Sequence, residues 1–457
     1  MIKMKRAILL MLFSITAIIG SIGYLKAGYN GWDTAYMVIR MYLFDADTFG
    51  NNLWIEAARW TAPIFTVSGV AILMKKFIGR IKDFFVGFSS DSIALYGDAE
   101  MKTMAKANMK HAIIARDNEP IDAKSHMIMF GTDEKCLEFY KKNKEKLHGE
   151  VFIKLEKNDI LTASLDDVKF FNFCEITARS FWQDYDIRRV IHEGKMKIAI
   201  VGSDVLARKI LAYGLLNNVY SLSQEIEYHV FSNNHLFEEA HSDFETLNSD
   251  RILYRDNQST QRLLEIASAD RIIITDLQDN EVMSEIVKMT KGEIYCFDPN
   301  STFVNIFEYE KIYPFGQYTA LITEKNIRHF NQLAKELNYQ YAVAYAENPA
   351  TIEEAWDKLD TFTKGSNIAA MDYHKIRLIV MRETGKSEAD EALSEMEHIR
   401  WCRYHFINHW KYGETANGKK DRENKIHPCL KPYSELKRED QIKDKEGIQV
   451  LLSLENI

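Results

Sequence analysis

The sequence predicts three kinds of structure in one chain of 457 residues. These are an N-terminal two-helix transmembrane hairpin, tandem Rossmann-like α/β units with doubly wound parallel sheets, and a mainly α-helical C-terminal domain. Two long apolar runs near the N-terminus predict the hairpin. Short apolar strands that alternate with helix-period stretches predict the α/β units. Aromatic and basic residues crowd the last hundred positions and set the C-terminal domain apart.

The composition is that of a folded protein without an extreme charge. Hydrophobic residues make up 46% and charged residues 27% of the chain, and the net charge is −8. Because this balance provides no strongly basic surface, no nucleic-acid partner is expected. The length predicts two to four domains. The chain has five cysteines, an odd number with no paired spacing, which argues against a secreted disulfide framework.

Residues 1–82 are predicted to form the hairpin, with spans at about residues 7–25 and 53–74. Each run has roughly the length that crosses a ~30 Å hydrocarbon layer. Basic residues precede the first run and follow the second, and such residues favour the cytoplasmic side. Both termini are therefore expected in the cytoplasm, with the lipid bilayer as a partner. A cleaved signal peptide is the alternative for the first run.

Two features of the hairpin leave its role open. Glu56 and Arg59 are three residues apart on one helical face, where they either pair, line a polar path or lie at headgroup depth. Residues 33–45 read as a short amphipathic helix that is interfacial or re-entrant. Two helices enclose nothing, so a pore requires several subunits. A pore and a plain anchor both remain hypotheses.

Two Rossmann-like units are predicted in series, at residues 83–194 and 195–312. Ser92–Gly97 and Lys197–Gly202 are short apolar strands that each lead into a helix-period stretch. Further strand-like segments alternate with helical stretches, which is the pattern of a parallel, doubly wound sheet. These segments are His111–Ala115, His126–Phe130, Val151–Leu155, Val168–Phe173, Glu227–Ser232, Arg251–Tyr254, Arg271–Thr275 and Glu293–Phe297.

The second unit contains a degraded dinucleotide fingerprint. A dinucleotide site needs glycines where the backbone approaches the pyrophosphate, and an acid that binds the ribose. Here Gly202 is followed by Ser203, by Asp204 at the second glycine position and by Ala207 at the third. An acidic side chain directed at a phosphate is electrostatically unfavourable. NAD(H) is a possible cofactor at these four residues, but a scaffold without cofactor is the favoured interpretation.

A helical connector is predicted at residues 313–385, followed by an aromatic and basic domain at residues 386–457. Aromatic faces stack on planar rings, and Arg, His and Lys donate to phosphates or carboxylates. The pattern therefore predicts a pocket for a nucleotide-like ligand, although the same residues also suit an ordinary core. The predicted pocket residues are Glu397, His398, Arg400, Trp401, Trp410, Tyr412, Lys425, His427, Pro428, Pro432 and Tyr433.

No metal site and no catalytic group are predicted. His398, Cys402, His405 and His409 follow one another at steps of four, three and four residues. One helix cannot direct four such ligands at one ion without partners from elsewhere. The sequence offers no arrangement typical of nucleophilic or acid–base catalysis, so the protein is not expected to be an enzyme.

Residues 388–446 resemble the ryanodine receptor (RyR) domain. The resemblance depends on three elements: Glu397-His398-x-Arg400-Trp401, Trp410-x-Tyr412-Gly413 and His427-Pro428-x-Leu430-x-Pro432-Tyr433. Upstream, the tandem Rossmann units, Pro314-Phe315-Gly316, Ser366-Asn367, Asp372 and His374 are similar to bacterial membrane proteins that join a Trk-type NAD-binding (TrkA-N, RCK-like) region to an RyR domain.

The resemblance implies a ligand-gated effector or ion channel in the bacterial inner (plasma) membrane. Its RyR domain would sense a nucleotide-derived small molecule, and its RCK-like units would form a homo-oligomer, a dimer or tetramer, that transmits the signal. By analogy with bacterial RyR-domain proteins, a role in antiviral signalling is a further expectation. The alternatives are a regulatory subunit of a separate potassium or other ion transporter and, less favoured, a membrane-bound NAD-dependent oxidoreductase.

Overall fold

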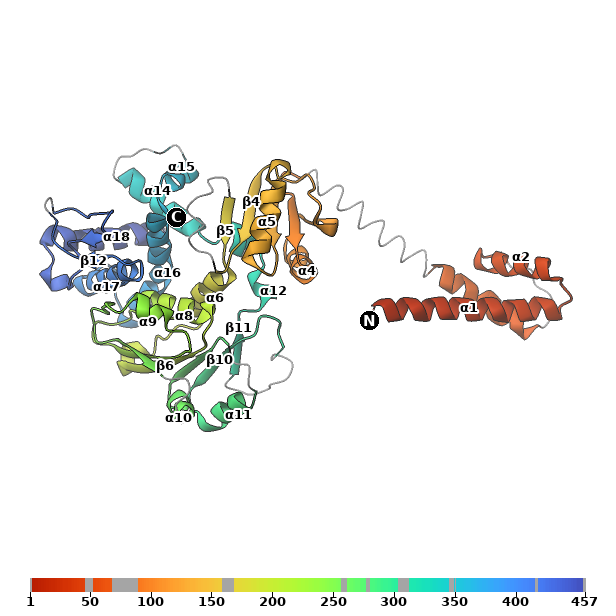
Figure 1. Ribbon diagram of the computed structural model, residues 1–457, viewed down its shortest axis with the longest axis horizontal. Coiled ribbons are helices and arrows are strands. Elements are labelled where there is room, and N and C mark those ends of the chain that lie inside the picture. Colours follow the sequence, from red (N-terminus) through yellow and green to blue (C-terminus); the bar gives the residue numbers. More distant parts are fainter. Residues whose placement is uncertain are drawn as a thin grey trace. The chain divides into compact units, whose positions relative to one another are not determined.

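The computed structural model describes residues 2–45, 52–67, 89–157, 168–255, 261–276, 280–302, 312–344, 349, 351–415 and 418–454. The chain divides into two compact units, Met1–Ser92 and Ile93–Ile457 (Figure 1). Each unit is described by itself below.

The described part of the N-terminal unit is helical. It consists of α1 (Ile2–Lys26), α2 (Gly31–Tyr42) and a helix at residues 53–67. Asn30 caps α2, because its side chain accepts a hydrogen bond from the amide of Asp33 at 2.9 Å. At Gly23 a Cβ atom would lie 2.7 Å from the side chain of Ile55, so the approach of the third helix to α1 requires glycine there.

The transmembrane hairpin predicted for residues 1–82 is corrected by the structure, and the predicted fold class was wrong in this part. Among the residues that the structure describes, none of the helices combines the length and the apolar character needed to cross a bilayer. A span takes about 20 predominantly apolar residues. The helix at residues 53–67 includes Glu56 and Arg59, and α2 has 12 residues. Residues 68–74 of the predicted second span lie outside the described residues.

The first sheet of the larger unit is parallel and has the strand order β2-β1-β3-β4-β5. This is the order of flavodoxin-like sheets. Strand β1 lies between β2 and β3 and is buried at every position, which explains its uniformly apolar sequence. The elements of this part are β1 (Ile93–Gly97), α4 (Ala99–Asn108), β2 (Ala112–Ile114), η1 (Arg116–Asn118), β3 (Ser125–Met129), α5 (Asp133–Asn143), η2 (Lys144–Lys146), β4 (Glu150–Lys154) and β5 (Val168–Phe171).

The second sheet is also parallel, with the order β11-β10-β9-β6-β7-β8. Read from β8, this is the strand order of dinucleotide-binding Rossmann sheets. The edge strand β11 was not predicted, and it contains Pro314. The elements are α6 (Phe173–Asp184), α7 (Val190–Glu193), β6 (Lys195–Val201), α8 (Val205–Asn217), β7 (Glu225–Phe231), α9 (Leu236–Ala240), β8 (Arg251–Arg255), α10 (Arg262–Ala267), β9 (Arg271–Ile274), α11 (Asn280–Met289), β10 (Glu293–Phe297) and β11 (Ile312–Phe315).

The C-terminal part is mainly helical, and the two parallel sheets agree with the predicted α/β architecture. Its helices are α12 (Tyr318–Leu321), α13 (Glu324–Arg328), α14 (Gln332–Ala344), α15 (Ile352–Asp357), α16 (Thr361–Thr384), α17 (Glu391–Ile407) and α18 (Arg438–Leu454). A small two-stranded sheet, β12 (Lys411–Tyr412) and β13 (Ile426–His427), and the turn η4 (Tyr433–Glu435) connect α17 to α18.

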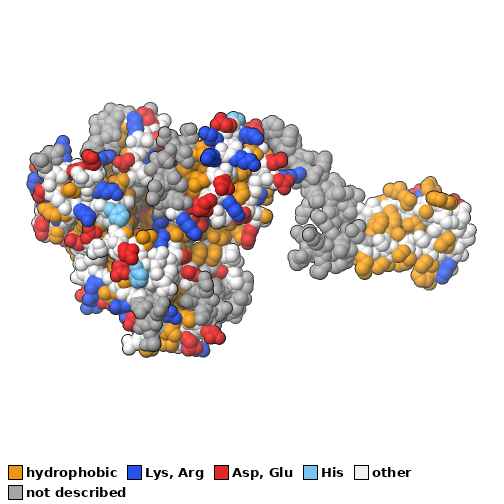
Figure 2. Space-filling model, viewed as in Figure 1, with side chains coloured by type: hydrophobic (Ala, Val, Ile, Leu, Met, Phe, Trp, Pro, Cys, Tyr) orange, Lys and Arg blue, Asp and Glu red, His pale blue; other side chains and the backbone are white. Residues whose placement is uncertain are grey.

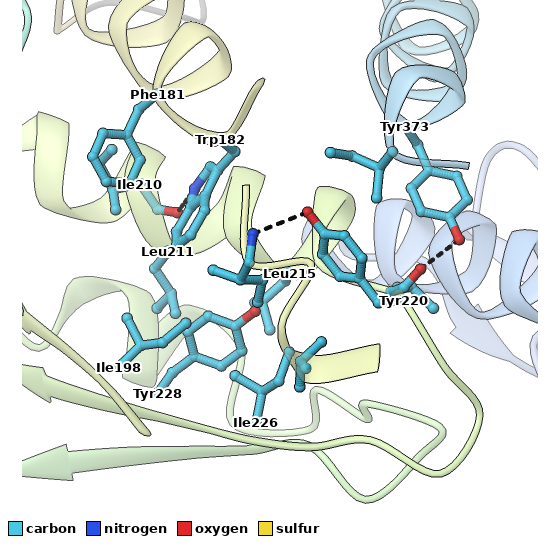
Figure 3. Close-up of a cluster of buried hydrophobic side chains, with 14 of the residues drawn as sticks. Phe181, Trp182, Ile198, Ile210, Leu211, Leu215, Tyr220, Ile226, Tyr228 and Tyr373 are labelled. Atoms are coloured by element: carbon cyan, nitrogen blue, oxygen red, sulfur yellow. Dashed lines mark hydrogen bonds between the residues drawn. The ribbon is translucent and has the colours of Figure 1, made fainter. Parts of the chain in front are cut away.

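One hydrophobic core joins the second sheet to the C-terminal helices. It contains side chains of β6, β7 and α8 together with Tyr373 of α16, Met396 of α17 and Ile448 of α18. Figure 3 shows part of it: the hydroxyl group of Tyr373 donates to the carbonyl oxygen of Val219 at 2.6 Å. The indole N–H of Trp182 donates to the carbonyl oxygen of Ile210 at 2.8 Å. The C-terminal helices thus share the core of the Rossmann-like unit.

A buried arginine fixes α17 to the second sheet. Arg403 and Asp250 have no exposed side-chain area, and the guanidinium Nη2 lies 2.8 Å from the carboxylate Oδ2. Arg403 also donates to the carbonyl oxygens of Thr246 and Leu215, each at 3.0 Å. Asp250 in turn accepts from the amide of Ile226 in β7 at 2.8 Å. The pair therefore connects α17 to α8 and to the start of β7 and β8.

Replacing Arg403 is expected to destabilise the chain severely. Arg403→Ala leaves the carboxylate of Asp250 buried without its cation, which typically costs about 3–5 kcal/mol. Urea unfolding followed by tryptophan fluorescence measures the change. Arg438→Ala, at an arginine whose side chain is 72% exposed, is the control and is expected to change the unfolding free energy by less than about 0.5 kcal/mol. Equal effects of the two substitutions would contradict the anchoring role of Arg403.

Candidate functional site

Helix α17 carries four of the predicted pocket residues and separates them onto different sides. The helix begins after Asp390, whose carboxylate accepts from the amide of Leu393 at 2.9 Å. Most of its side chains are buried, because α17 packs against α8, α16 and α18. Its polar residues therefore have to be satisfied inside the protein.

Glu397 and Arg400 belong to a buried ionic cluster toward α16. The carboxylate of Glu397 accepts from Arg400 Nη2 at 2.7 Å and from Arg377 Nη2. Burial alone would raise the pKa of Glu397, but the guanidinium groups of Arg400 and Arg377 lower it below its usual range. Burial and the charge of Arg377 lower the pKa of the adjacent His374 to about 4. The cluster is therefore ionised at Glu397 and neutral at His374 near pH 7.

His398 forms a second buried polar group, on the side of α18. Its Nε2 lies 2.9 Å from the carbonyl oxygen of Lys431 and its Nδ1 lies 3.3 Å from the carboxylate of Asp444. Burial opposes the charged imidazole, yet the hydrogen bonds and charges of Asp444 and Cys402 raise the pKa of His398 to about 10. Cys402 Sγ lies 3.3 Å from Nε2, but burial raises the pKa of this thiol. A buried thiol of this kind is not an activated nucleophile.

Trp401, Trp410 and His427 come together around His405 in an aromatic cluster. The ring centroids of Trp401 and His405 are 4.0 Å apart, and those of Trp401 and His427 are 4.9 Å apart. His405 and Trp410 are 5.5 Å apart in an edge-on arrangement. Burial lowers the pKa of His405 to about 3 and that of His427 to about 4, so both are neutral at pH 7. Trp401 and His427 are only half-buried and reach the surface.

The remaining predicted pocket residues lie around this cluster, but their side chains do not converge on one point. Tyr412 is half exposed, and the ammonium group of Lys431 lies 5.6 Å from its ring. Lys425 is exposed, and its ammonium group donates to the carbonyl oxygen of Asn408 at 3.2 Å. Pro428 is half-buried and Pro432 is exposed, where it precedes η4. Tyr433 is buried near His398, with 5.8 Å between ring centroids.

The four-residue series considered for a metal does not converge. His405 Nδ1 lies 2.9 Å from the carbonyl oxygen of Trp401, whereas His409 stacks on His241 with 4.7 Å between centroids. In the part of the chain that the structure describes, no group of three or more His, Cys, Asp or Glu side chains is arranged to hold a metal ion.

At the degraded dinucleotide fingerprint, the carboxylate of Asp204 lies at the N-terminus of α8. Asp204 caps α8, because its Oδ1 accepts from the amide of Ala207 at 2.9 Å and from the hydroxyl group of Thr275 at 2.7 Å. Gly202 has a φ of 154°, and a Cβ there would meet Thr275 at 2.1 Å. Ser203 Oγ accepts from the amide of Asn233 at 2.8 Å. An internal anion therefore lies at the helix N-terminus, where a pyrophosphate binds in intact fingerprints.

The polar pair of the N-terminal unit is present as an ion pair. Arg59 Nη1 lies 3.4 Å from Glu56 Oε1, and the two side chains are 36% and 41% exposed. The segment predicted as an amphipathic helix at residues 33–45 contains α2, and Arg40 pairs with Asp45 at 2.9 Å. Both pairs are internal to this unit.

A comparison with family models supports the C-terminal resemblance. The RyR domain model matches residues 370–454. This segment contains α17, the aromatic cluster and α18, and it begins within α16, upstream of the start predicted at residue 386. No curated protein and no solved structure matches the chain. The comparisons thus support the RyR domain and provide no match for the TrkA-N resemblance.

Several residues that hold this site together were not predicted from the sequence. Arg403, Asp250 and Arg377 are buried and charged, but nothing in their spacing shows which partner each one meets. Arg403 lies three residues after Arg400 on α17, at a position that an exposed ion pair would equally occupy. The predicted helix α17 has charged residues on every side, and this pattern could have indicated that some of them are buried as ion pairs.

The His398–Asp444 pair predicts a specific pH dependence. The folded-state pKa of about 10 lies above the value of about 6.5 for an unfolded histidine. The stabilisation is therefore complete below about pH 6.5 and is lost as the pH rises toward 10. The urea unfolding free energy of the parent is expected to fall more steeply between pH 7 and 10 than that of His398→Gln. Parallel curves for the two proteins would show that His398 is not held as an imidazolium.

Proposed function

We propose that the chain is a non-enzymatic sensor and effector whose RyR domain binds a nucleotide-derived small molecule. The single observation that carries this proposal is the position of α17. The same helix holds the aromatic cluster at the protein surface and the Arg403–Asp250 pair at the second sheet. A ligand that shifts α17 would therefore act directly on the Rossmann-like core.

The aromatic cluster suits a planar, anionic ligand. Trp401 and His427 present partly exposed, neutral rings. The side chains of Lys420 and Lys425 lie in the same connection between α17 and α18, and both residues are exposed. Rings stack on a base, and ammonium groups attract phosphate. This combination supports a nucleotide-derived ligand over an uncharged or cationic one.

The second Rossmann-like unit is proposed to transmit the signal without a cofactor. Its strand order supports a relation to NAD-binding proteins of the TrkA-N type, and the Asp204 cap argues against NAD(H) at the usual position. Transmission requires that the ligand bind one conformation more tightly than another. A homo-oligomer of such units is the proposed assembly.

The N-terminal unit is proposed to contact a lipid surface. Trp32, Leu53 and Trp60 are 90%, 82% and 73% exposed, and Figure 2 shows hydrophobic side chains spread over this unit. Four of its charged side chains form the ion pairs Arg40–Asp45 and Glu56–Arg59, and the ammonium group of Lys26 lies 5.0 Å from the ring centroid of Trp54. Apolar surface of this extent on a soluble protein would be costly to expose to water. Trp side chains favour the headgroup boundary of a bilayer.

Ligand binding predicts a rise in melting temperature. ATP, GTP and NAD⁺ at increasing concentrations are tested on the full chain in a mild detergent, because a ligand that binds only the folded state stabilises it in proportion to RT ln(1 + [L]/Kd). Trp401→Ala and Lys425→Gln are expected to reduce the shift by weakening binding at least about tenfold. Lys110→Gln, at an exposed lysine after α4, is the control. Unchanged shifts in both test variants would contradict a ligand at the aromatic cluster.

Lipid contact predicts co-flotation of the full chain with vesicles. The triple variant Trp32→Ser, Leu53→Ser, Trp60→Ser is expected to reduce the bound fraction at least about twofold, because each substitution removes apolar area from the contact. The control replaces Leu222, Leu236 and Leu264, which are exposed on the larger unit, by serine. Equal losses in the two triple variants, or no flotation of the parent, would refute a lipid role for the N-terminal unit.

A further inference from the structure

A cavity of about 600 Å³ lies among α6, α13, α14 and α16. It is built from residues other than those of the aromatic cluster. Helix α16 contributes Met371, Asp372 and Lys375, which fall within the segment that matches the RyR domain. The volume lies within the range of about 300–1,000 Å³ that is typical of small-molecule sites.

The floor of the cavity is a buried polar group that holds α6 to α16. Arg179 is 3% exposed, and its Nε and Nη2 donate to the two carboxylate oxygens of Asp372 at 2.6 and 3.0 Å. Arg179 Nη1 also donates to the side-chain oxygen of Asn331 at 2.9 Å. Gln183 Nε2 donates to Asp372 Oδ1 at 3.0 Å. Glu175 Oε1 also lies 3.7 Å from Arg179 Nη1. The bidentate pair fixes the shape of the floor.

The wall of the cavity is apolar and aromatic. Phe330 lies over Arg179, with 4.1 Å between the guanidinium carbon and the ring centroid. Phe181 and Phe315 line the cavity as well, and their ring centroids are 4.8 Å apart. The turn after β11 requires Gly316, which has a φ of 76° and lies so close to Phe297 that a Cβ would meet its ring at 2.6 Å. Phe181 and Phe315 are 2% and 4% exposed, so the half-buried Phe330 is the ring of this wall that is open to a ligand.

The rim of the cavity carries more positive than negative charge. Lys325 and Lys375 are exposed there, and Lys375 Nζ donates to Gln183 Oε1 at 2.7 Å. The acid among the lining residues of the rim is Asp184. Burial raises the pKa of Asp184 although both lysines act to lower it. His329 also lines the rim.

We infer that this cavity is a second ligand site and that it binds a nucleoside phosphate, with the base against Phe330 and the phosphate at Lys325 and Lys375. The apolar wall matches a planar ring, and the excess of ammonium groups matches an anion. The floor provides fixed polar groups for ring or sugar contacts. The inference goes beyond the proposed function because the cavity involves none of Trp401, His427 or Lys425.

Calorimetric titration of the full chain with ATP, GTP and NAD⁺ tests the inference. Lys325→Gln combined with Lys375→Gln is expected to weaken binding of the best of these probes at least tenfold. Tripolyphosphate, which has charge without a base, and adenosine, which has a base without charge, are both expected to bind more weakly than ATP. The matched control is Lys110→Gln combined with Lys146→Gln, at two exposed lysines of the first sheet's unit. Phe330→Leu keeps an apolar wall and is expected to weaken ATP more than tripolyphosphate.

The outcomes separate this site from the aromatic cluster. Loss of binding in the cavity variant, with binding retained in Trp401→Ala, supports the cavity site and overturns the site of the proposed function. Two bound ligands per chain, one lost in each variant, support both. Full retention in the cavity variant overturns the inference, as does the absence of binding of all three probes. Equal affinity for ATP and tripolyphosphate also overturns it, because charge alone would then account for binding.

Discussion

The buried pair of Arg403 and Asp250 is the interaction on which the arrangement of the larger unit depends. An ion pair with no exposed area tolerates the loss of neither partner, because the remaining charge would stay in a low-dielectric interior. Its hydrogen bonds reach Thr246, Leu215 and Ile226, so one guanidinium and one carboxylate link a helix of the RyR-matched segment to three separate pieces of the Rossmann-like unit. A hydrophobic core that both parts share fills the space around the pair.

Charge is distributed unevenly around α17. The buried charged side chains lie on the sides of the helix that pack against the protein, and the rings of the aromatic cluster lie on the side proposed to face a ligand. Toward α16 the helix presents Glu397 and Arg400 in a buried ionic cluster, and toward α18 it presents His398 beside the carboxylate of Asp444, which raises the pKa of the imidazole. The aromatic cluster around His405 is neutral by contrast, since burial keeps its histidines unprotonated. Ionised groups therefore hold the helix in place, while the surface that reaches solvent consists of rings. A ligand at those rings would not have to displace any of the buried ion pairs.

The sequence predicted much of the α/β architecture, because apolar strands and helix periods are local patterns. All ten strand segments named from the sequence occur as β1–β10. The edge strand β11 was missed because Pro314 and Gly316 are typical of turns, and only its pairing with β10 makes it a strand. The transmembrane prediction depended on the length of two apolar runs and on the basic residues beside them, whereas no helix among the described residues is both long and apolar enough to cross a bilayer. The cavity could not be predicted, since Arg179 and Asp372 are 193 positions apart and meet only in the folded chain.

Pro314 has a further consequence for the behaviour of this protein at high local concentration. A parallel sheet whose last strand is open invites a strand of another molecule to add to it, which is how many proteins begin to form fibres. A proline on that last strand removes one of the donors that an added strand would need, and its ring hinders close approach. Among the described residues β11 pairs with β10 alone. Pro314 therefore makes strand addition at this edge unfavourable, and an ordered assembly of copies would be expected to use other surfaces.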